Sequence, residues 1–497
     1  MQRRLSETIA DETEPRGAIN ADSTDGDGKF VLGDQLTDEQ RRQMTELLMN
    51  YDDVFTSTPG RTELIMHHIK LTDTQPVWQP SYRIPESLRA EVETELQTML
   101  DQGIIRYDNE TRYNSPLLVL KRKTGGLRLV NNFIELNRKT QTDRYQMTNA
   151  NELISRVAGS KFITIIDLNR FFFQLMIAPE CQHLTGFYTP YGTFCYVRLP
   201  LGLHGAPSTA QRLIDRVLRG AHKYANALLD DISIHSTTWQ GHLRHVQDIL
   251  ERLRKAGLTA NVKKCVFASN RLTLLGHQII DGQILPDEGK IQVVKNWKPP
   301  KNKTQLKSFL GLSNFFHQYI DHHAEICAPL TDLLARNKPD KLAWGQRQQE
   351  AFDNLKQALI SRPILRPPDM SKDMKLYTDA SKQSISGVLM QFDDVNQCDY
   401  VIAYASRKLL PRETRYSTIE LELMAIVFAL THFHHWTYGK KTHVYSDHRP
   451  LMWLNSITKH SDRLARWALI LQNYDVEVTY IKGEKQIADA LTRLPEE

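Results

Sequence analysis

The sequence predicts a large α+β body followed by a smaller α/β domain. The chain has 497 residues, which is too long for a single hydrophobic core. A stretch rich in proline and charge, SRPILRPPDMSKD, is typical of a linker and ends at residue 373. Short β-rich runs mixed with helical patterns precede this linker. A segment of ordinary domain size, in which strand and helix patterns are interspersed, follows it.

The composition excludes several classes of protein. Hydrophobic residues make up 41% and charged residues 24%, as in ordinary globular proteins, and no apolar run approaches the ~20 residues that cross a membrane. Residues 1–35 lack the apolar segment of a secretory signal, so we expect a flexible leader and no export. The five cysteines lie far apart, which favours reduced thiols in an intracellular protein. The net charge of +5 is only weak evidence for a polyanionic partner.

The elements of the body follow from local patterns. LTDEQRRQMTELLMNYDDVF predicts a helix entered from Thr37 or Asp38, because its apolar residues recur at helical spacing. A second helix is predicted over residues 85–105, ending at Gly103. SPLLVLKR and LRLVNNF, separated by a glycine turn, predict a hairpin. KFITIIDL predicts a strand of β-branched residues that ends in an acid.

The later elements are predicted in the same way. Residues 207–218 predict a helix that leads into the run ALLDDISIHS, and residues 241–258 predict another helix. Residues 286–334 should be mostly helical. Beyond the linker we predict a strand in MKLYTDAS, a helix near residue 420, a strand in THVYSDH and a short helix at the C-terminus.

The run ALLDDISIHS places Asp230 and Asp231 side by side between apolar residues. An ionised carboxylate removed from water without a partner is costly, so this pair needs either backbone amides at a hairpin tip or a cation. Adjacent strand residues point to opposite faces, so both acids reach one ion only at a turn. Asp167 ends the strand in KFITIIDL and can supply a third carboxylate. Three such acids can hold two divalent ions for phosphodiester chemistry.

The second domain offers another set of acids at strand and helix positions. Asp379, Glu422, Asp447 and Asp489 stand in YTDAS, the helix near residue 420, YSDHRP and QIADAL. Glu420 competes with Glu422 for the helical position. Ser417 and Glu420 match the capping box Ser-x-x-Glu, so we assign the metal role to Glu422.

These motifs resemble those of one family. Asp167, LPLGLHGAPSTAQRLID, LLDD, Lys264-Cys265 and Leu275-Gly276-His277, in this order, resemble the reverse transcriptase of gypsy-like LTR retrotransposons (Metaviridae). YTDAS, YSTIELELMAIVFAL, YSDHRPL and RLARWALILQNYDVEVTYIKGEKQIADALTR resemble the ribonuclease H that follows it in the same polyprotein. The resemblance covers residues 36–494, and its specificity comes from the order of many motifs that are weak alone.

The resemblance implies a right-hand polymerase with fingers, palm and thumb, followed by an α/β ribonuclease H-like domain. The implied parts are a leader (1–35), fingers and palm (36–282), thumb (283–335), a connecting segment (336–373) and the ribonuclease H domain (374–497). The implied activity is DNA synthesis on RNA and DNA templates from a DNA primer and dNTPs, with cleavage of the RNA strand of RNA/DNA hybrids. The implied cofactor is Mg²⁺, two ions per active site, with Mn²⁺ as a substitute.

The resemblance also implies roles for individual residues. The metal-binding catalytic acids are Asp167, Asp230 and Asp231 in the polymerase, and Asp379, Glu422, Asp447 and Asp489 in the nuclease. The implied nucleotide-binding residues are Arg122, Arg128, Phe172 and Gln174, with Phe172 as a gate against the ribose 2′-hydroxyl. Leu275, Gly276 and His277 match the primer grip, and residues 303–319 look like thumb helices.

Several of these assignments have a structural alternative. Phe172 lies in Phe171-Phe172-Phe173 and can belong to the core, and Arg122 can be a solvated surface charge. Gln174 can satisfy a backbone group, and His277 can be a packed, hydrogen-bonded histidine. Lys263 and Lys264 can contact phosphate or only water.

Two other interpretations of the whole chain stay open at this point. A pararetroviral polymerase shares the architecture. A domesticated nucleic-acid-binding protein without polymerase activity is the second, although all seven carboxylates are retained. The resemblance further implies a homodimer on substrate, and a cytoplasmic location within virus-like particles without membrane attachment.

Overall fold

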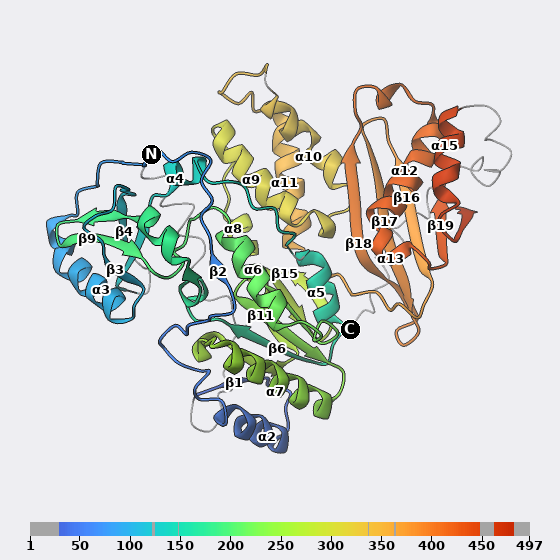
Figure 1. Ribbon diagram of the computed structural model, residues 1–497. Coiled ribbons are helices and arrows are strands. Elements are labelled where there is room, and N and C mark those ends of the chain that lie inside the picture. The colour runs from blue at the N-terminus through green and yellow to red at the C-terminus, as the bar shows by residue number, and fades with distance from the viewer. Residues whose placement is uncertain are drawn as a thin grey trace. The chain divides into compact units, whose positions relative to one another are not determined.

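Residues 29–121, 125–147, 149–335, 337–361, 364–447 and 462–481 are described in the computed structural model of this chain. Contacts divide the chain into two compact units, Met1–Leu275 and Gly276–Glu497, whose elements are labelled in Figure 1. Residues 1–28 of the expected leader and the expected C-terminal helix lie outside the described residues. The predicted leader ends too late, at residue 35, because Phe30 and Leu32 are fully buried and Val31–Leu32 form strand β1. In the described ranges, no helix is long and apolar enough to cross a membrane.

The first unit contains a five-stranded sheet with strand order β1-β12-β6-β11-β10. Its strands are β1 (Val31–Leu32), β12 (Val266–Ser269), β6 (Phe162–Asp167), β11 (Asp231–Ser236) and β10 (Ala225–Leu228). β6 lies at the centre, antiparallel to both β12 and β11, and all of its residues are buried. The strand predicted in KFITIIDL is confirmed, because β-branched residues buried on both faces suit a central strand.

Helices cover this sheet. α5 (Ala150–Ala158), α6 (Ala206–Val217) and α7 (Trp239–Ala256) contact its strands, and α2 (Asp38–Met49) contacts α7. The helices predicted at these positions from Thr37, over residues 207–218 and over residues 241–258 are confirmed. Thr37 begins α2 with a capping box shared with Gln40, which satisfies two backbone N–H groups at the helix start.

Small sheets and short helices complete the first unit. The hairpin predicted from SPLLVLKR and LRLVNNF is confirmed as β4 (Leu117–Lys121) and β5 (Leu127–Asn131). The second predicted helix consists of a 3-10 turn, Glu86–Leu88, followed by α3 (Arg89–Asp101). The remaining strands and α-helix are β2 (Met66–His67), β3 (Ile105–Tyr107), β7 (Met176–Ile177), β8 (Phe187–Thr189), β9 (Gly192–Tyr196), β13 (Arg271–Leu274) and α4 (Ile134–Arg138).

The turn between β10 and β11 is held by a side chain from α6. Gln211 is fully buried; its side-chain oxygen accepts a hydrogen bond from Leu229 N at 3.0 Å, and its amide donates to Ala227 O at 3.2 Å. Leu229 has a φ of +56°, a left-handed conformation that leucine rarely adopts. The two hydrogen bonds from Gln211 support this unusual backbone, and so they position Asp230, the next residue.

The second unit begins with a hairpin and a group of helices. β14 (His277–Ile280) pairs with β15 (Gln283–Pro286). The predicted helical tract contains α8 (Glu288–Lys295), α9 (Lys303–Phe315), α10 (His323–Thr331) and two 3-10 turns, His317–Tyr319 and Asp332–Leu334. α11 (Gln346–Ile360) follows and packs against α8 and α10.

A second five-stranded sheet follows, with strand order β18-β17-β16-β19-β20. Its strands are β16 (Met374–Ala380), β17 (Ser384–Asp393), β18 (Cys398–Lys408), β19 (Thr442–Ser446) and β20 (Val476–Tyr480). β16 is antiparallel to β17 and parallel to β19, and these strands confirm the predictions from MKLYTDAS and THVYSDH. α13 (His434–Thr437), α15 (Asp462–Leu471) and a 3-10 turn, Glu413–Arg415, complete this part.

The predicted helix near residue 420 is α12 (Thr418–His432), which crosses one face of this sheet (Figure 1). A Cβ atom on Gly387 of β17 would lie 2.6 Å from Ala429 Cβ of α12, a distance that real Cβ atoms do not reach. Only glycine therefore permits this close approach of strand and helix. α12 is buried along most of its length, as a helix in the middle of a core must be.

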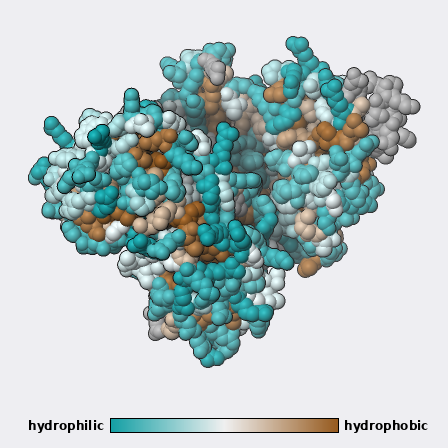
Figure 2. Space-filling model, in the orientation of Figure 1, coloured by the Kyte–Doolittle hydropathy of each residue, from teal (hydrophilic) through white to brown (hydrophobic). Residues whose placement is uncertain are grey.

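The surface is mixed in character. Figure 2 shows a face on which hydrophilic residues predominate and hydrophobic patches are scattered. The five cysteines are free thiols, four of them buried, as expected for a protein without disulfides.

We predict that Gln211→Leu destabilises the first unit although it adds apolar surface. The substitution leaves the amide of Leu229 without its partner, and a lost buried hydrogen bond costs about 1–3 kcal/mol. The midpoint of thermal unfolding should fall by several degrees. Gln240→Leu is the matched control, because Gln240 lies exposed on α7. Equal midpoints for the two variants would contradict the role of Gln211.

Candidate active sites

The first group of acids lies where β6 meets the β10–β11 turn. Asp167 ends β6 and is the direct cross-strand partner of Asp231, so both side chains leave the same face of the sheet. Asp230 precedes Asp231 in the turn, and its carbonyl accepts a hydrogen bond from Leu168 N at 3.0 Å. The structure thus brings together the three predicted acids. In the part of the chain that the structure describes, the ligand atoms of these three acids do not all lie within 4.8 Å of one another. The three carboxylates are therefore more widely spaced than those of the second group described below.

A lysine reaches this first group. Lys264 Nζ lies 3.5 Å from Asp167 Oδ2, so Lys264 faces a carboxylate rather than water alone. The neighbouring Cys265 is fully buried, and burial is the main reason that its thiol pKa is raised to about 12. A thiol with this pKa stays protonated at neutral pH and is a poor metal ligand. The carboxylate oxygens are therefore the groups at this site that could hold a metal ion.

The predicted nucleotide residues Phe172 and Gln174 lie in the 3-10 helix Phe171–Gln174. Gln174 is fully buried; its amide donates to Asn169 O at 2.7 Å and Thr259 O at 2.9 Å, and its oxygen accepts from Thr259 N at 2.8 Å. These bonds use both ends of the side chain and favour the structural alternative for Gln174. Phe172 is half-buried, so part of its ring is accessible.

The predicted arginines belong to the β4–β5 hairpin. Arg128 lies on β5, half-buried, opposite Leu120 of β4. Arg122 lies outside the described residues.

Of the predicted primer-grip residues, Leu275 and Gly276 form the turn between β13 and β14, and His277 begins β14. Leu275 and Gly276 have φ values of +49° and +79°. His277 is 2% exposed, and its ring lies 5.2–5.8 Å from the rings of Phe315, Phe316 and Tyr319. This packing favours the structural alternative for His277.

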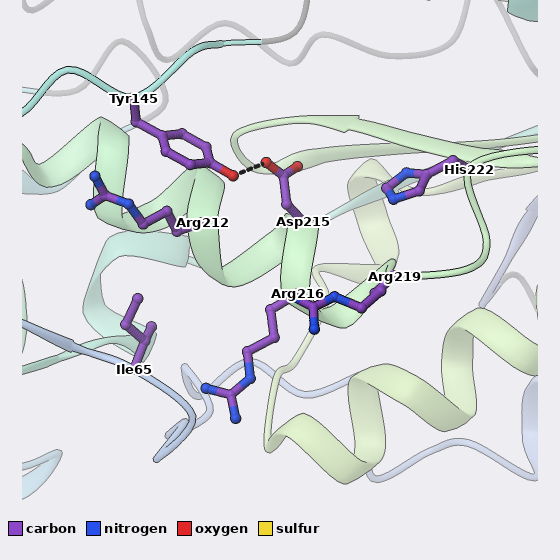
Figure 3. Close-up of a pocket in the computed structure, with 7 residues that line it drawn as sticks. All are labelled: Ile65, Tyr145, Arg212, Asp215, Arg216, Arg219 and His222. Carbon is purple, nitrogen blue, oxygen red and sulfur yellow. Dashed lines mark hydrogen bonds between the residues drawn. The ribbon is translucent and has the colours of Figure 1, made fainter.

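A pocket of about 480 Å³ lies along α6 and is lined by Ile65, Tyr145, Arg212, Asp215, Arg216, Arg219 and His222 (Figure 3). Tyr145 Oη donates to Asp215 Oδ2 at 2.6 Å, and Gln211 Nε2 donates to Asp215 Oδ1 at 2.9 Å. The pocket is therefore connected to the turn that carries Asp230. The sequence analysis missed Gln211 and Asp215. Gln211 stands three residues before the buried Ile214, and a polar residue on the apolar face of a helix is the signal that could have identified it.

The second group of acids lies at the ends of β16 and β19. Tyr377 and Tyr445 are register partners on these parallel strands, and their rings stack at 4.7 Å. Asp379 and Asp447 each stand two residues later and so leave neighbouring strands at the same level. Glu422 reaches them from the first part of α12, and the ligand atoms of Asp379, Glu422 and Asp447 lie within 4.8 Å of one another. Asp489 lies outside the described residues.

Burial and neighbouring acids raise the pKa values of two of these carboxyl groups. The pKa of Glu422, which is 3% exposed, is raised to about 8, mainly by burial and further by Asp447 and Asp379. Burial also raises the pKa of Asp379. Ser446 Oγ donates to Glu422 Oε2 at 3.3 Å, which only partly stabilises the ionised form.

The predicted capping role of Glu420 is confirmed, and the metal role of Glu422 stays a prediction. Glu420 accepts from Ser417 N at 2.9 Å and pairs with Arg463 at 2.7 Å, so its carboxylate is used in the capping box and an ion pair. Glu422 points instead to Asp379 and Asp447.

Both groups fit a divalent metal ion. Their donors are carboxylate oxygens, which Mg²⁺ prefers. In the second group, burial raises the pKa of Glu422, and the neighbouring Asp447 and Asp379 raise it further. A bound cation would remove the repulsion between these carboxylates.

The chain matches two protein families along its length. Residues 119–279 match "Reverse transcriptase (RNA-dependent DNA polymerase)", and residues 369–474 match "RNase H-like domain found in reverse transcriptase". The first match contains Asp167, Asp230 and Asp231, and the second contains Asp379, Glu422 and Asp447.

Solved structures share the fold. A foamy viral protease-reverse transcriptase in complex with dsDNA superposes with a TM-score of 0.80 at 21% identity, covering 90% of this chain and 95% of that one. The same viral protein in complex with an RNA/DNA hybrid gives a TM-score of 0.74 at 21% identity, covering 93% of this chain and 63% of that one. These similarities confirm the predicted α+β polymerase fold followed by a ribonuclease H-like domain.

Curated relatives identify the family. The retrovirus-related Pol polyprotein from transposon 297 of Drosophila melanogaster is 35% identical over 87% of this chain and 41% of its own length. The Tf2-3 polyprotein of Schizosaccharomyces pombe is 32% identical over 84% of this chain and 31% of its own length. The chain thus spans less than half of these relatives, which are elements of the gypsy class, as the resemblance implied. The chain belongs to the Pol-type reverse transcriptases of LTR retrotransposons that carry an RNase H-like domain.

Proposed function

We propose that this chain synthesises DNA on RNA and DNA templates and cleaves the RNA strand of RNA/DNA hybrids, in the replication of an LTR retrotransposon. The observation that carries this proposal is the presence of two separate groups of acids, one in each compact unit. Each group lies inside the matched domain whose chemistry needs it.

We assign metal binding to these acids. Asp167, Asp230 and Asp231 would hold Mg²⁺ in the polymerase site, and Asp379, Glu422 and Asp447, together with Asp489, would hold it in the nuclease site. Bound in pairs, such ions activate an attacking oxygen and stabilise a leaving oxygen in phosphoryl transfer, and Mn²⁺ can replace Mg²⁺. The protein's part is to keep the acids in register, which the β6–β11 and β16–β19 pairings do.

The other residues bind and orient the substrates. Arg128 and Arg122 would grip the triphosphate, since guanidinium groups suit bidentate phosphate contacts. The accessible part of the Phe172 ring would exclude a ribose 2′-hydroxyl. Leu275, Gly276 and His277 would support the primer strand through the shape of their turn, with the His277 ring held in its aromatic cluster. Gln174 would hold the backbone at Asn169 and Thr259 in place rather than contact the nucleotide.

We extend the partners of this chain by analogy with its relatives. The foamy viral structures hold dsDNA and an RNA/DNA hybrid, and we propose the same ligands here, with RNA template, DNA primer and dNTPs. We also propose a homodimer on substrate and action within virus-like particles in the cytoplasm.

Single substitutions should separate the two activities. Asp230→Asn should abolish extension of a labelled DNA primer on an RNA template while leaving hybrid cleavage nearly intact, because Asp230 lies in the first unit. Asp379→Asn should do the reverse. For each variant, DNA synthesis is measured by primer extension and nuclease activity by cleavage of a hybrid, both in the presence of Mg²⁺.

Folding controls decide how a loss is interpreted. Each variant must keep the thermal unfolding midpoint of the parent protein within about 2 °C, a shift of roughly 1 kcal/mol or less. If either single substitution in folded protein removes both activities, the assignment of two independent sites is wrong. If the parent protein binds primed template but adds no nucleotide, the polymerase assignment fails.

The next prediction concerns sugar selection. Phe172→Val should admit ribonucleotides, because the smaller side chain leaves room for the 2′-hydroxyl. Single-nucleotide incorporation compares kcat/KM for dNTP and rNTP, and we expect the preference for dNTP to fall by at least tenfold. Phe173→Val is the matched control in the same 3-10 helix. An unchanged preference in Phe172→Val would rule out the gate.

A further prediction uses the raised pKa of Glu422. The folded, metal-free protein binds the Glu422 proton more tightly than the unfolded chain does, since the pKa is about 8 against an ordinary 4.5. The free energy of unfolding should therefore fall as pH rises from about 4.5 to about 8, by up to ~1.4 kcal/mol per pH unit. Glu422→Gln should flatten this fall, and it should also reduce the rise in unfolding midpoint that Mg²⁺ produces at pH 7.5.

The control for this experiment lies on the same helix. Hydrogen bonds from Ser417 and the charge of Arg463 lower the pKa of Glu420 although burial opposes them, so Glu420→Gln should keep the pH-dependent fall. Thermal unfolding in EDTA and in Mg²⁺ at pH 5 and pH 7.5 measures all three proteins. Parallel curves for Glu422→Gln and the parent would contradict the prediction.

A further inference from the structure

Residues 321–325, which we call the 321–325 segment, lie against the nuclease sheet next to Asp379. Gly387 faces α12, so the preceding Ser386 faces the opposite side of the sheet. Ser386 is the register partner of Asp379 on one side and of Ser406 on the other. Asp379, Ser386 and Ser406 therefore form a polar row across three strands, on the face away from the body of α12. Glu422 of α12 reaches Asp379 at the end of β16.

The 321–325 segment is anchored to this row and its surroundings by three hydrogen bonds. His322 Nδ1 lies 3.3 Å from Ser386 Oγ, and Ala324 N donates to Ser406 Oγ at 2.9 Å. Ser384 Oγ donates to Glu325 Oε2 at 3.0 Å. His322 therefore contacts Ser386, the residue directly beside Asp379 on the neighbouring strand.

The backbone of His322 is unusual. It has a φ of +49° and a ψ of 27°, the left-handed region that residues other than glycine seldom occupy. The next residue, His323, is held on its other side by a hydrogen bond between Nε2 and Ser313 Oγ of 2.8 Å. Contacts on both sides thus maintain a strained backbone conformation of a kind that is common at functional sites.

The charges around His322 show what it can contribute. Glu325 and Asp447 raise the pKa of Asp379 in addition to burial, whereas His322 acts in the opposite direction. Asp321 adds a further carboxyl group, with Oδ1 3.6 Å from His322 Nε2. A phosphodiester that approaches Asp379 on this side meets several acids, and the imidazole of His322, 36% exposed, is the neighbouring hydrogen-bond donor.

We propose that His322 is a substrate-binding residue of the nuclease site, whose imidazole N–H donates to a phosphate oxygen of the RNA strand beside the cleaved linkage. This inference rests on the proposed hybrid cleavage. The donor needs no added proton: the tautomer that accepts from Ser386 Oγ at Nδ1 carries its proton on Nε2. Since the matched RNase H-like domain covers residues 369–474, His322 completes that site from outside the domain.

The first arm of the test uses the full chain with two substitutions. His322→Asn removes the imidazole but keeps a residue that tolerates the left-handed backbone. We expect KM for hybrid cleavage to rise about tenfold with kcat nearly unchanged, as for the loss of one hydrogen bond to a charged group. His322→Gln, whose amide can replace the Nε2 donor, should recover most of this loss.

The second arm locates the contact. A hybrid with a single neutral methylphosphonate is cleaved by the parent protein and by His322→Asn, and the neutral group is moved along the RNA strand. At one position the parent should lose about tenfold in kcat/KM and the variant almost nothing, because the contact is already absent. If every position affects both proteins equally, or if His322→Asn keeps the parent KM, the proposal is overturned.

Three controls distinguish the loss of the His322 contact from other causes of weaker cleavage. His434→Asn removes an exposed histidine beyond the C-terminal end of α12 and should leave cleavage unchanged. The Mg²⁺-induced rise in unfolding midpoint should persist in His322→Asn; its loss would mean that the substitution disturbs the metal site, which overturns the assigned role. If the folded parent protein does not cleave the hybrid at all, the proposed nuclease function fails and takes this inference with it.

Discussion

The structure depends on holding like charges close together. Carboxylates repel one another, and burial adds to the cost of their ionised form, as the pKa of Glu422 near 8 shows. Both groups of acids are built on adjacent strands, where backbone hydrogen bonds supply the rigidity that the side chains cannot. In the first unit the pairing is antiparallel, Asp167 with Asp231, and in the second it is parallel, with Asp379 and Asp447 two residues beyond stacked tyrosines. Different topologies thus serve the same electrostatic purpose.

Much of this was predictable from the sequence, because it is local. β-Branched residues predicted β6, local strand and helix patterns predicted β16, α6, α7 and α12, and the capping box gave Glu420 a structural role that Glu422 does not have. The acids themselves were recognised through the order of motifs. The structure shows how the separate chain segments that carry each group meet, and no local sequence pattern contains this information.

The parts that sequence could not predict depend on contacts between distant residues. Gln211 supports the turn at Leu229 from another element, and nothing in AQRLID reveals its partner. Gln174 looked like a nucleotide contact, yet its hydrogen bonds go to backbone groups at Asn169 and Thr259. The 321–325 segment reaches the nuclease sheet from a tract whose pattern indicated only helices. In each case a polar side chain is explained by a backbone or hydroxyl group far away in sequence.

The parallel pairing of β16 with β19 has a consequence for the order of folding during synthesis. β16, β17 and β18 form a continuous antiparallel meander and can pair as soon as they emerge from the ribosome. Asp447 is translated 68 residues after Asp379 (447 − 379), whereas Asp167 and Asp231 are complete some 200 residues earlier than Asp447 (447 − 231 = 216). A nascent chain can therefore assemble its first group of acids well before its second.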